Sequence, residues 1–387
     1  MKRALIFKLI LPGIILLTVS YLSFMFIRSC SWVIVFLTFF AISVYLGISF
    51  KKAPFKFISF NIAAVFLALF LFESYLFLSK DVKKYGQISG SIADGNYFAP
   101  NNYLGFGVNK DTVFTSKKTL VSKVIFDVSY TIKNRIRHTP NSNENSRNSV
   151  LFFGCSNTYG EGIQDTATLP FYFNRFAGGK YKVFNYAFPG YGPQQMLANI
   201  ENRVNKDIEG CNGSKIAFYC FIADHVARAA GYRDCNRNGP RYEVIDGRLQ
   251  NKGFFKRSRL QIIIEDILDQ SYTYLRMFPL KKPNHKDFIR TIEIIRKSKE
   301  LLNSMGIKFY VFIWETDCSN QFKEKNDYIF FQDELKKSNI PMLFVKDAIP
   351  DYDNNFDNYT IPIDKHPNDL CNMKIGQYLY QQIKDTL

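Results

Sequence analysis

A serine, a histidine and an aspartate in the second part of the chain have the types and positions expected for nucleophilic catalysis. Ser156 follows the apolar run 149–153, and Asp364 and His366 lie near the C-terminus, ahead of a stretch with helical spacing at 373–383. A serine is a weak nucleophile without an adjacent base. A histidine moves protons near neutral pH, and an aspartate can orient the imidazole and stabilise its charged form. We therefore predict that Ser156 is the nucleophile, His366 its base and Asp364 the residue that holds His366.

Each of these segments also has a simpler structural interpretation when it is taken alone. Ser156 would serve as an ordinary cap, since serine often begins helices. The Asp-x-His pair would fit an exposed loop equally well. The chain has only four histidines, which gives His366 weight, but the chemical interpretation depends on the segments being taken together.

Two further segments place polar groups directly after apolar runs. Gly190 lies in a Pro-Gly turn, where a backbone N–H can face a ligand. Asp224, His225 and Arg228 follow the apolar run 215–222. Taken alone, the first segment would be an ordinary turn and the second a polar strand end.

The elements around these residues alternate between short apolar strands and amphipathic helices. That order predicts a parallel sheet with helices on both faces, in which ligands bind beyond the carboxyl ends of the strands. The residues from about 229 to 284 interrupt the order with a hairpin around Asp246 and Gly247 and an extra helix. The predicted strands are 149–153, 181–186, 215–222, 307–314 and 341–345, and the predicted helices are 193–205, 260–277, 286–305, 327–337 and 373–383.

Taken in chain order, these segments resemble the sequence blocks of the SGNH, or GDSL-like, hydrolase superfamily over residues 148–387. The family's first block, Gly-Asp-Ser with a nearby glycine, is similar to Gly-Cys-Ser-Asn-Thr-Tyr-Gly-Glu-Gly at 154–162, and its last block is similar to Asp364 and His366. The resemblance implies an α/β fold, a flavodoxin-like α/β/α sandwich with a parallel sheet, that cleaves or transfers acyl esters. It implies that Ser156 is the nucleophile.

The same resemblance implies where the oxyanion hole lies. Ser156 and Gly190 would each donate a backbone N–H, and Asp224 stands where the family has an asparagine as the third donor. An ionised carboxylate accepts hydrogen bonds and cannot donate one, and the loss of one donor typically costs ~10²–10³ in rate. The hole would then depend on the two backbone groups, or on His225 or Arg228, which are the candidate substrate-binding residues.

The type of enzyme that the chain resembles is the membrane-anchored, cell-envelope type. This implies a serine esterase or O-acyltransferase that acts on acyl, above all acetyl, esters of a cell-envelope polysaccharide, with no metal or organic cofactor and with room for partner subunits of an envelope-modification system. Hydrolysis and transfer both stay open. Asp224 favours an alternative, a non-catalytic glycan-binding or assembly subunit that kept the fold. Cys155, which replaces the family's usual aspartate, is a weaker alternative nucleophile.

The first eighty residues contain three apolar stretches, at 4–27, 32–50 and 57–78, each close to the ~20 residues that cross a bilayer. They predict an anchor of three transmembrane helices, although a cleavable signal peptide is an alternative for the first stretch. The Lys/Arg bias of the short loops places the N-terminus in the cytoplasm and the large C-terminal domain in the periplasm or outside the cell. Glu73 lies near the outer end of the third stretch, where a functional role and simple contact with the interface are both open.

The 387-residue chain has a net charge of +16 and is 47% hydrophobic, too apolar for a disordered chain. It has no nucleic-acid motif, so we assign the charge to a basic surface and membrane-flanking lysines; it is also compatible with an anionic glycan.

The expected organisation is a membrane anchor at 1–79, a linker with a small β-rich segment at 80–147, and the hydrolase domain at 148–387. The cysteine spacings match no zinc site, and a Cys211–Cys235 disulfide and free thiols are both open.

Overall fold

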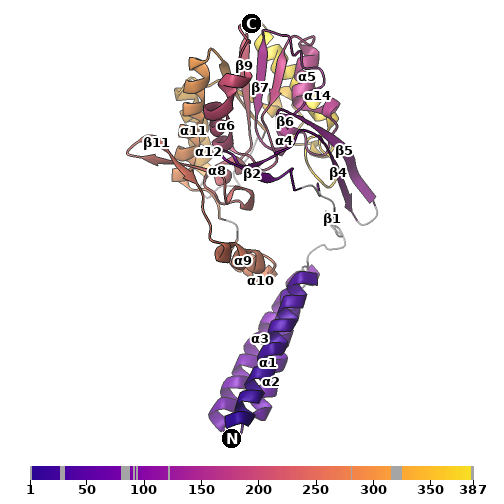
Figure 1. Ribbon diagram of the computed structural model, residues 1–387, viewed down its shortest axis with the longest axis vertical. Helices are drawn as coiled ribbons and strands as arrows, with labels where there is room; N and C mark the ends of the chain where they lie inside the picture. The colour runs from indigo at the N-terminus through magenta and orange to yellow at the C-terminus, as the bar shows by residue number, and fades with distance from the viewer. Residues whose placement is uncertain are drawn as a thin grey trace. The chain divides into compact units, whose positions relative to one another are not determined.

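The chain forms two compact units in the computed structural model, and each is described by itself (Figure 1). The first unit comprises residues 1–87 and 257–280, and the second comprises 88–256 and 281–387. The structure describes residues 2–26, 31–79, 88–89, 92, 95–120, 123–279, 281–314 and 325–384.

Apolar helices make up most of the first unit. The N-terminal part supplies α1 (Lys2–Phe26), α2 (Ser31–Ser49) and α3 (Ala53–Ser79), and the insertion supplies α9 (Arg259–Leu268) and α10 (Tyr272–Met277). α2 and α3 are long and apolar enough to cross a membrane, because their lengths match or exceed the range of ~17–25 residues that the hydrocarbon core requires.

The prediction of three membrane-spanning helices was wrong by one. Among the described residues, α1 contributes an apolar stretch of Pro12–Phe24, which falls below the ~17 residues of a minimal span. Length and composition therefore give two candidate spans, α2 and α3.

A nine-stranded sheet forms the centre of the second unit within the described ranges. Its five parallel strands lie at the positions predicted from the apolar runs. Every residue of the first of them, β7, is buried, as expected for a strand covered on both faces. They are β7 (Ser149–Phe153), β8 (Lys182–Asn185), β9 (Lys215–Phe221), β12 (Lys308–Ile313) and β13 (Met342–Phe344).

The order of the parallel strands points to the position of a binding site. They lie in the order β8-β7-β9-β12-β13, which is the 2-1-3-4-5 order of flavodoxin-like folds. In such sheets ligands bind where the order reverses, outside the carboxyl ends of the first and third strands. Ser156 follows β7, and Asp224 follows β9, so both lie at this switch point.

Helices cover both faces of the sheet, as predicted (Figure 1). α5 and α14 lie on one face, and α6, α11 and α12 lie on the other, each group over its own apolar core. The helices of this unit are α4 (Ser156–Tyr159), α5 (Leu169–Phe176), α6 (Pro193–Asn199), α7 (Asn205–Asp207), α8 (Asp224–Ala229), α11 (His285–Ser304), α12 (Lys325–Lys337), α13 (Val345–Ala348) and α14 (Asp369–Ile383).

The residues before β7 belong to the same sheet, which differs from the separate segment expected at 80–147. β6 pairs with β8 through Arg137 and Asn185, β5 pairs with β6, β4 with β5, and β1 with β4, all antiparallel. β6 is thus hydrogen-bonded directly to the parallel sheet, and β5, β4 and β1 extend the same sheet one strand at a time. The strands are β1 (Ile88–Ser89), β4 (Val113–Leu120), β5 (Lys123–Lys133) and β6 (Ile136–Arg137), beside a small hairpin of β2 (Ala99–Asn101) and β3 (Gly105–Gly107).

The insertion contains the predicted hairpin but two helices in place of the predicted one. β10 (Pro240–Ile245) and β11 (Arg248–Phe254) are joined by Asp246 and Gly247 at φ angles of 50° and 73°, which a two-residue type I′ turn requires. The predicted helix 260–277 is divided at Ser271, whose hydroxyl accepts from the N–H of Tyr274 and so caps α10.

The cysteines of the described chain form no disulfide between Cys211 and Cys235. Both side chains are free thiols. The sequence left a Cys211–Cys235 disulfide and free thiols both open, and the structure has free thiols.

Candidate active site

Ser156, His366 and Asp364 form a continuous chain of hydrogen bonds. His366 Nε2 lies 2.8 Å from Ser156 Oγ, and His366 Nδ1 lies 2.5 Å from Asp364 Oδ1. The Asp364 side chain has no exposed surface, whereas that of His366 is 22% exposed. This is the arrangement in which an imidazole takes a serine proton and a carboxylate stabilises the imidazolium that results.

A tight turn after β7 positions Ser156 as the first residue of α4. The turn requires Gly154, because a Cβ at that position would lie 2.4 Å from Thr158 Oγ1 and 3.2 Å from the Cys220 carbonyl oxygen. Ser156 is 9% exposed. The strand, turn and helix together place its hydroxyl at the carboxyl end of the central strand.

A buried arginine from β6 fixes the loop that follows α4. Arg137 is 1% exposed and donates to the carbonyl oxygens of Tyr159 at 2.9 Å, Gly160 at 2.5 Å and Ile163 at 2.7 Å. It also pairs with Asp165 at 3.1 Å. The five donors of a rigid guanidinium fork suit this set of acceptors. The strands before β7 therefore hold the loop of the candidate nucleophile.

Asp364 and His366 lie in a loop that its own backbone hydrogen bonds close. The N–H of Ile361 donates to the His366 carbonyl oxygen at 2.8 Å, and the N–H of Lys365 donates to the Ile361 carbonyl oxygen at 2.9 Å. Ile363 and Lys365 have φ angles of 71° and 69°, a region that a β-branched residue rarely adopts. Strain of this kind costs ~1–3 kcal/mol per residue and gathers at functional sites.

Two charged side chains that were not predicted to be functional contact Asp364 and His366. Lys118 Nζ, from β4, lies 2.5 Å from Asp364 Oδ2. Glu161 Oε2, from the loop after α4, lies 3.6 Å from His366 Nε2. Glu161 had a local signal, since it lies in the Gly-Glu-Gly of the first block; Lys118 had none, because its partner is 246 positions away.

These neighbours set the proton affinities of the site. Burial alone raises the pKa of Asp364, but the hydrogen bonds and charges of His366 and Lys118 outweigh it and lower the pKa to about 2. Burial alone lowers the pKa of His366, but the hydrogen bond of Asp364 and the charges of Glu161 and Asp364 raise it above its usual value. Asp364 is therefore ionised at neutral pH and favours a proton on His366.

Two backbone N–H groups are available for an oxyanion. Among the residues that the structure describes, the N–H groups of Ser156 and Gly190 have no hydrogen-bond acceptor. Gly190 has a φ of 85°, and a Cβ there would lie 3.0 Å from the Cβ of Cys235. Its carbonyl oxygen accepts from Asn236 Nδ2 at 3.2 Å, which fixes the orientation of the turn.

Asp224 is engaged by two arginines, so it supplies no donor. Its carboxylate accepts from Arg228 Nε at 2.8 Å and from Arg233 Nε at 2.6 Å. Burial raises the pKa of Asp224, but the two guanidinium charges outweigh burial and lower it. The negative charge that the sequence placed at the oxyanion position is therefore matched by two positive charges.

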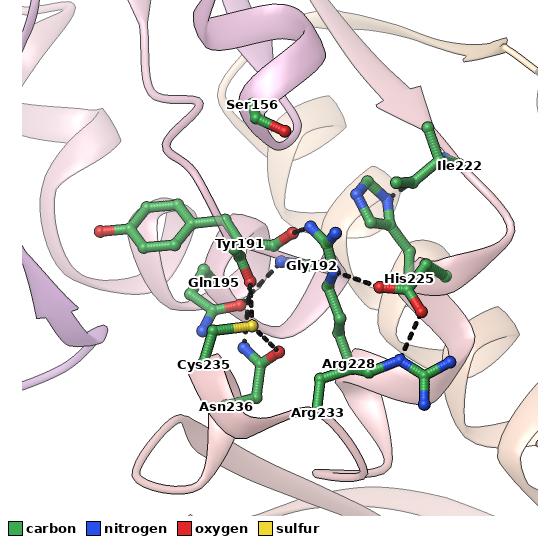
Figure 2. A network of polar contacts seen from close by, with 12 residues as sticks. Ser156, Tyr191, Gly192, Gln195, Ile222, His225, Arg228, Arg233, Cys235 and Asn236 are labelled. Carbon is green, nitrogen blue, oxygen red and sulfur yellow. Dashed lines mark hydrogen bonds and ion pairs between the residues drawn. The ribbon is translucent and has the colours of Figure 1, made fainter. Parts of the chain in front are cut away.

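Of the two arginines that bind Asp224, Arg228 is the one whose guanidinium lies toward Ser156 in Figure 2. Its Nη1 donates to the Tyr191 carbonyl oxygen at 2.9 Å, while within the described ranges its Nη2 has no hydrogen-bond partner. In Figure 2 the Ser156 hydroxyl is directed toward the part of the network that contains the Arg228 guanidinium. Its side chain is 13% exposed, which leaves a partly desolvated donor beside the switch point.

His225 and Cys155 are both in the interior. His225 is 0% exposed, and its Nδ1 lies 2.7 Å from the hydroxyl of Tyr219, with the two rings stacked. Its position therefore does not support the predicted contact with substrate. The thiol of Cys155 belongs to a residue with no exposed surface, so it is poorly placed to act as a nucleophile.

A small cavity of about 120 Å³ lies beside Lys118 and Glu161. Lys118 and Glu161, which contact Asp364 and His366, form part of its wall, and Tyr97, Phe126 and Tyr130 form an aromatic part. The volume is below the ~300–1,000 Å³ of a site for a drug-sized ligand. The cavity is therefore suited to a small group.

No family model and no curated protein matches the chain. Among solved structures, the chain is similar to a GDSL-like lipase from Bacteroides thetaiotaomicron, with 13% identity, a TM-score of 0.31, and coverage of 62% of this chain and 90% of that one. It is also similar to a putative acylhydrolase from Bacteroides fragilis, with 12% identity, a TM-score of 0.32, and coverage of 64% and 92%. Likenesses at this level add no argument, so the function proposed below rests on the strand order and on the geometry of the site.

Proposed function

We propose that the protein is a membrane-anchored serine esterase or O-acyltransferase that acts on short acyl esters, and on acetyl esters of a cell-envelope polysaccharide in particular. The observation that carries the proposal is the Ser156–His366–Asp364 chain of hydrogen bonds, with distances of 2.8 and 2.5 Å, at the switch point of the sheet.

In the proposed reaction, His366 takes the proton of the Ser156 hydroxyl as Ser156 Oγ attacks the acyl carbonyl. The tetrahedral intermediate then expels the ester alcohol, which takes that proton from His366, and an acyl-serine remains. Water or a sugar hydroxyl, deprotonated by His366, attacks this acyl group and regenerates the serine. Asp364 stays ionised throughout and stabilises the imidazolium.

We assign the oxyanion hole to the N–H groups of Ser156 and Gly190 together with the guanidinium of Arg228. A fixed positive donor in a partly desolvated site stabilises the charge that develops on the acyl oxygen. Arg228 would thus take over the role that the asparagine side chain has in the family that the sequence resembles.

The small cavity supports a short acyl group. Its volume of about 120 Å³ and its aromatic wall suit an acetyl group better than a long acyl chain. The basic chain, with its net charge of +16, is compatible with an anionic glycan as the alcohol part. Partner subunits of an envelope-modification system belong to the same proposal.

The basic connection between α2 and α3 supports placement of the catalytic unit outside the cytoplasm. Lys51, Lys52 and Lys56 lie in and directly after the short connection between these helices. Basic loops stay in the cytoplasm, so Ser31 and Ser79 at the other ends of the two helices would lie on the outer side. The catalytic unit follows Ser79 in the chain.

The alternative of a non-catalytic glycan-binding subunit loses the feature that favoured it. That feature was the negative charge of Asp224, which Arg228 and Arg233 match. The alternative remains an outcome of the following test.

The test is hydrolysis of p-nitrophenyl acetate and labelling by a fluorophosphonate probe, with the full chain in detergent. We expect Ser156→Ala to lower kcat by several orders of magnitude, as loss of a serine nucleophile does, and to abolish labelling. The neighbouring Cys155→Ala variant serves as the control and should keep its label. Full activity in Ser156→Ala would refute the proposal, and binding of an acetylated polysaccharide without turnover would favour the binding subunit.

A further inference from the structure

One face of the insertion helices carries large apolar side chains that nothing in their own unit covers. Leu260, Ile263 and Ile264 on α9 are 66%, 55% and 46% exposed. Their spacing of three and four residues places them on one side of the helix. Met277 and Phe278 at the end of α10 are 64% and 59% exposed. Soluble surfaces rarely gather apolar side chains in this way without a partner.

The same two helices are attached to the proposed membrane helices by a buried carboxylate. Glu73, on α3, is 1% exposed. It accepts from the N–H groups of Tyr272 and Thr273, both at 2.7 Å, and from the Ser271 hydroxyl at 3.1 Å. The free N–H groups at the start of a helix need acceptors, and Glu73 supplies them for α10. This gives the intramembrane carboxylate noted in the sequence a structural partner.

A second attachment joins α9 to the start of α2. Trp32 Nε1 donates to the Ile267 carbonyl oxygen at 2.8 Å, and Ser31 Oγ donates to Gln270 Oε1 at 3.1 Å. Tryptophan gathers at the level of lipid headgroups, where its ring is apolar and its N–H finds a polar partner. One attachment is therefore made at the start of α2, and the other near the C-terminal end of α3.

The length of α3 places these attachments near the bilayer surface. α3 has 27 residues, which at 1.5 Å per residue is ~40 Å, whereas the hydrocarbon core is ~30 Å thick. About 10 Å, or six to seven residues, is left over. Because Lys56 stays outside the hydrocarbon, part of this excess lies at the start of α3; ~20 residues from Phe57 end near Leu76, and Glu73 lies within one turn of that boundary.

We propose that α9 and α10 form a membrane-interface element whose apolar face enters the boundary between lipid headgroups and acyl chains. An amphipathic helix of this kind lies in the plane of the bilayer, with its apolar side ~5–10 Å deep. The exposed Arg259 and Arg276 flank the apolar face, where they meet lipid phosphates. Asp269, directly after α9, is exposed on the opposite side of the helix and stays in water.

This inference rests on the membrane anchoring in the proposed function and is independent of the esterase chemistry. The test uses the full chain reconstituted in vesicles of phosphatidylcholine and phosphatidylglycerol, with a photoreactive benzoylphenylalanine in place of Ile263. We expect illumination to attach lipid to position 263. Position 269, at the C-terminal end of the same helix and on its opposite side, is the matched control and should give several-fold less lipid adduct.

A third labelled position separates failure of the inference from failure of the anchor. Val65, in the middle of α3, is 59% exposed and should react with lipid if α3 spans the bilayer. Lipid adducts at 65 but not at 263, equal adducts at 263 and 269, or an adduct of 263 with protein in place of lipid would each overturn the inference. Absence of lipid at 65 would overturn the anchor as well.

Discussion

The proton chemistry of His366 is set by two side chains of opposite charge that reach the site from outside its own loop. Glu161 faces Nε2, the atom that must accept the serine proton, and Lys118 faces the carboxylate on the other side of the ring. Glu161 raises the pKa of His366 and Lys118 lowers it. Removal of one or the other should therefore move the pH dependence in opposite directions.

We expect kcat/KM to fall at acidic pH with an apparent pKa above the ordinary histidine value of ~6.5, because only neutral His366 can accept the serine proton. Glu161→Gln removes a negative charge that favours the protonated form, so the acidic limb should move to lower pH. Lys118→Met removes a positive charge that disfavours it, so the limb should move to higher pH. The measurement is the pH–rate profile with p-nitrophenyl acetate. Shifts of the same sign in both variants would contradict the assignment.

Arg228 and Arg233 provide a matched pair for the oxyanion hole, since both bind Asp224 and only Arg228 is assigned to the substrate. We expect Arg228→Ala to lower kcat by ~10²–10³, the usual cost of one oxyanion donor, with a smaller change in KM. Arg233→Ala breaks the other ion pair of Asp224 and should cost much less. Steady-state kinetics with the acetyl ester decide this, and equal losses in the two variants would mean that Asp224, not the oxyanion, is what Arg228 serves.

At the scale of elements, β6 acts as a support for the nucleophile through a single side chain. Arg137 satisfies three loop carbonyl groups and one carboxylate in the interior. Arg137→Met leaves these acceptors buried without a donor, which typically costs ~3–5 kcal/mol. We expect a decrease of that size in the free energy of unfolding of the catalytic unit, measured by urea titration in detergent.

The control for this prediction is Arg175→Met on α5, where the side chain is exposed. Surface substitutions usually change stability by less than ~0.5 kcal/mol. A loss at Arg137 no larger than the loss at Arg175 would mean that the loop does not depend on β6.

The elements that the sequence predicted are those with a local signal. The five parallel strands are runs of buried apolar residues, and the hairpin at Asp246 and Gly247 has the turn chemistry that its φ angles require. Ser156 was found because it follows such a strand, and Asp364 and His366 because they form an Asp-x-His motif ahead of the C-terminal helix. Contacts between distant segments had no such signal. Lys118 reaches Asp364 only because β4 joins the sheet, and the partners of Asp224 are set by how α8 and the following loop fold back.

Two predictions differ from the structure: the separate β-rich segment before β7 and the number of candidate membrane spans. Residues 88–137 resemble a separate β-rich segment because their strands alternate apolar and polar residues, as do strands with one solvent-exposed face. Their pairing with β8 is a long-range backbone contact that alternation does not encode. Among the described residues, the helices long and apolar enough to span a membrane are α2 and α3.

At the scale of the whole molecule, the chain passes between the two units three times. It crosses at 87–88, at 256–257 and at 280–281, because residues 257–280 leave the catalytic unit and join the helices of the first. An enzyme on a simple stalk has one such crossing. Here the catalytic unit is continuous with α9 and α10 independently of the segment that follows α3.

A protease site placed at residues 82–87 tests what this means for retention on the membrane. After complete cleavage, we expect the fragment that begins at residue 88 to sediment with the membranes, because it still contains α9 and α10 and their hydrogen bonds to Glu73. The control carries the same site and a Gly-Ser linker in place of residues 257–280, and its fragment should stay in the supernatant. Release of the unaltered fragment would show that the insertion does not hold it.

The threaded insertion therefore bears on how such an enzyme would be lost from a cell surface. Many surface proteins are shed when a protease nicks one exposed stalk. In this chain a single nick after α3 breaks the polypeptide but leaves the catalytic unit attached, so shedding would also require α9 and α10 to come away from Glu73 and Trp32.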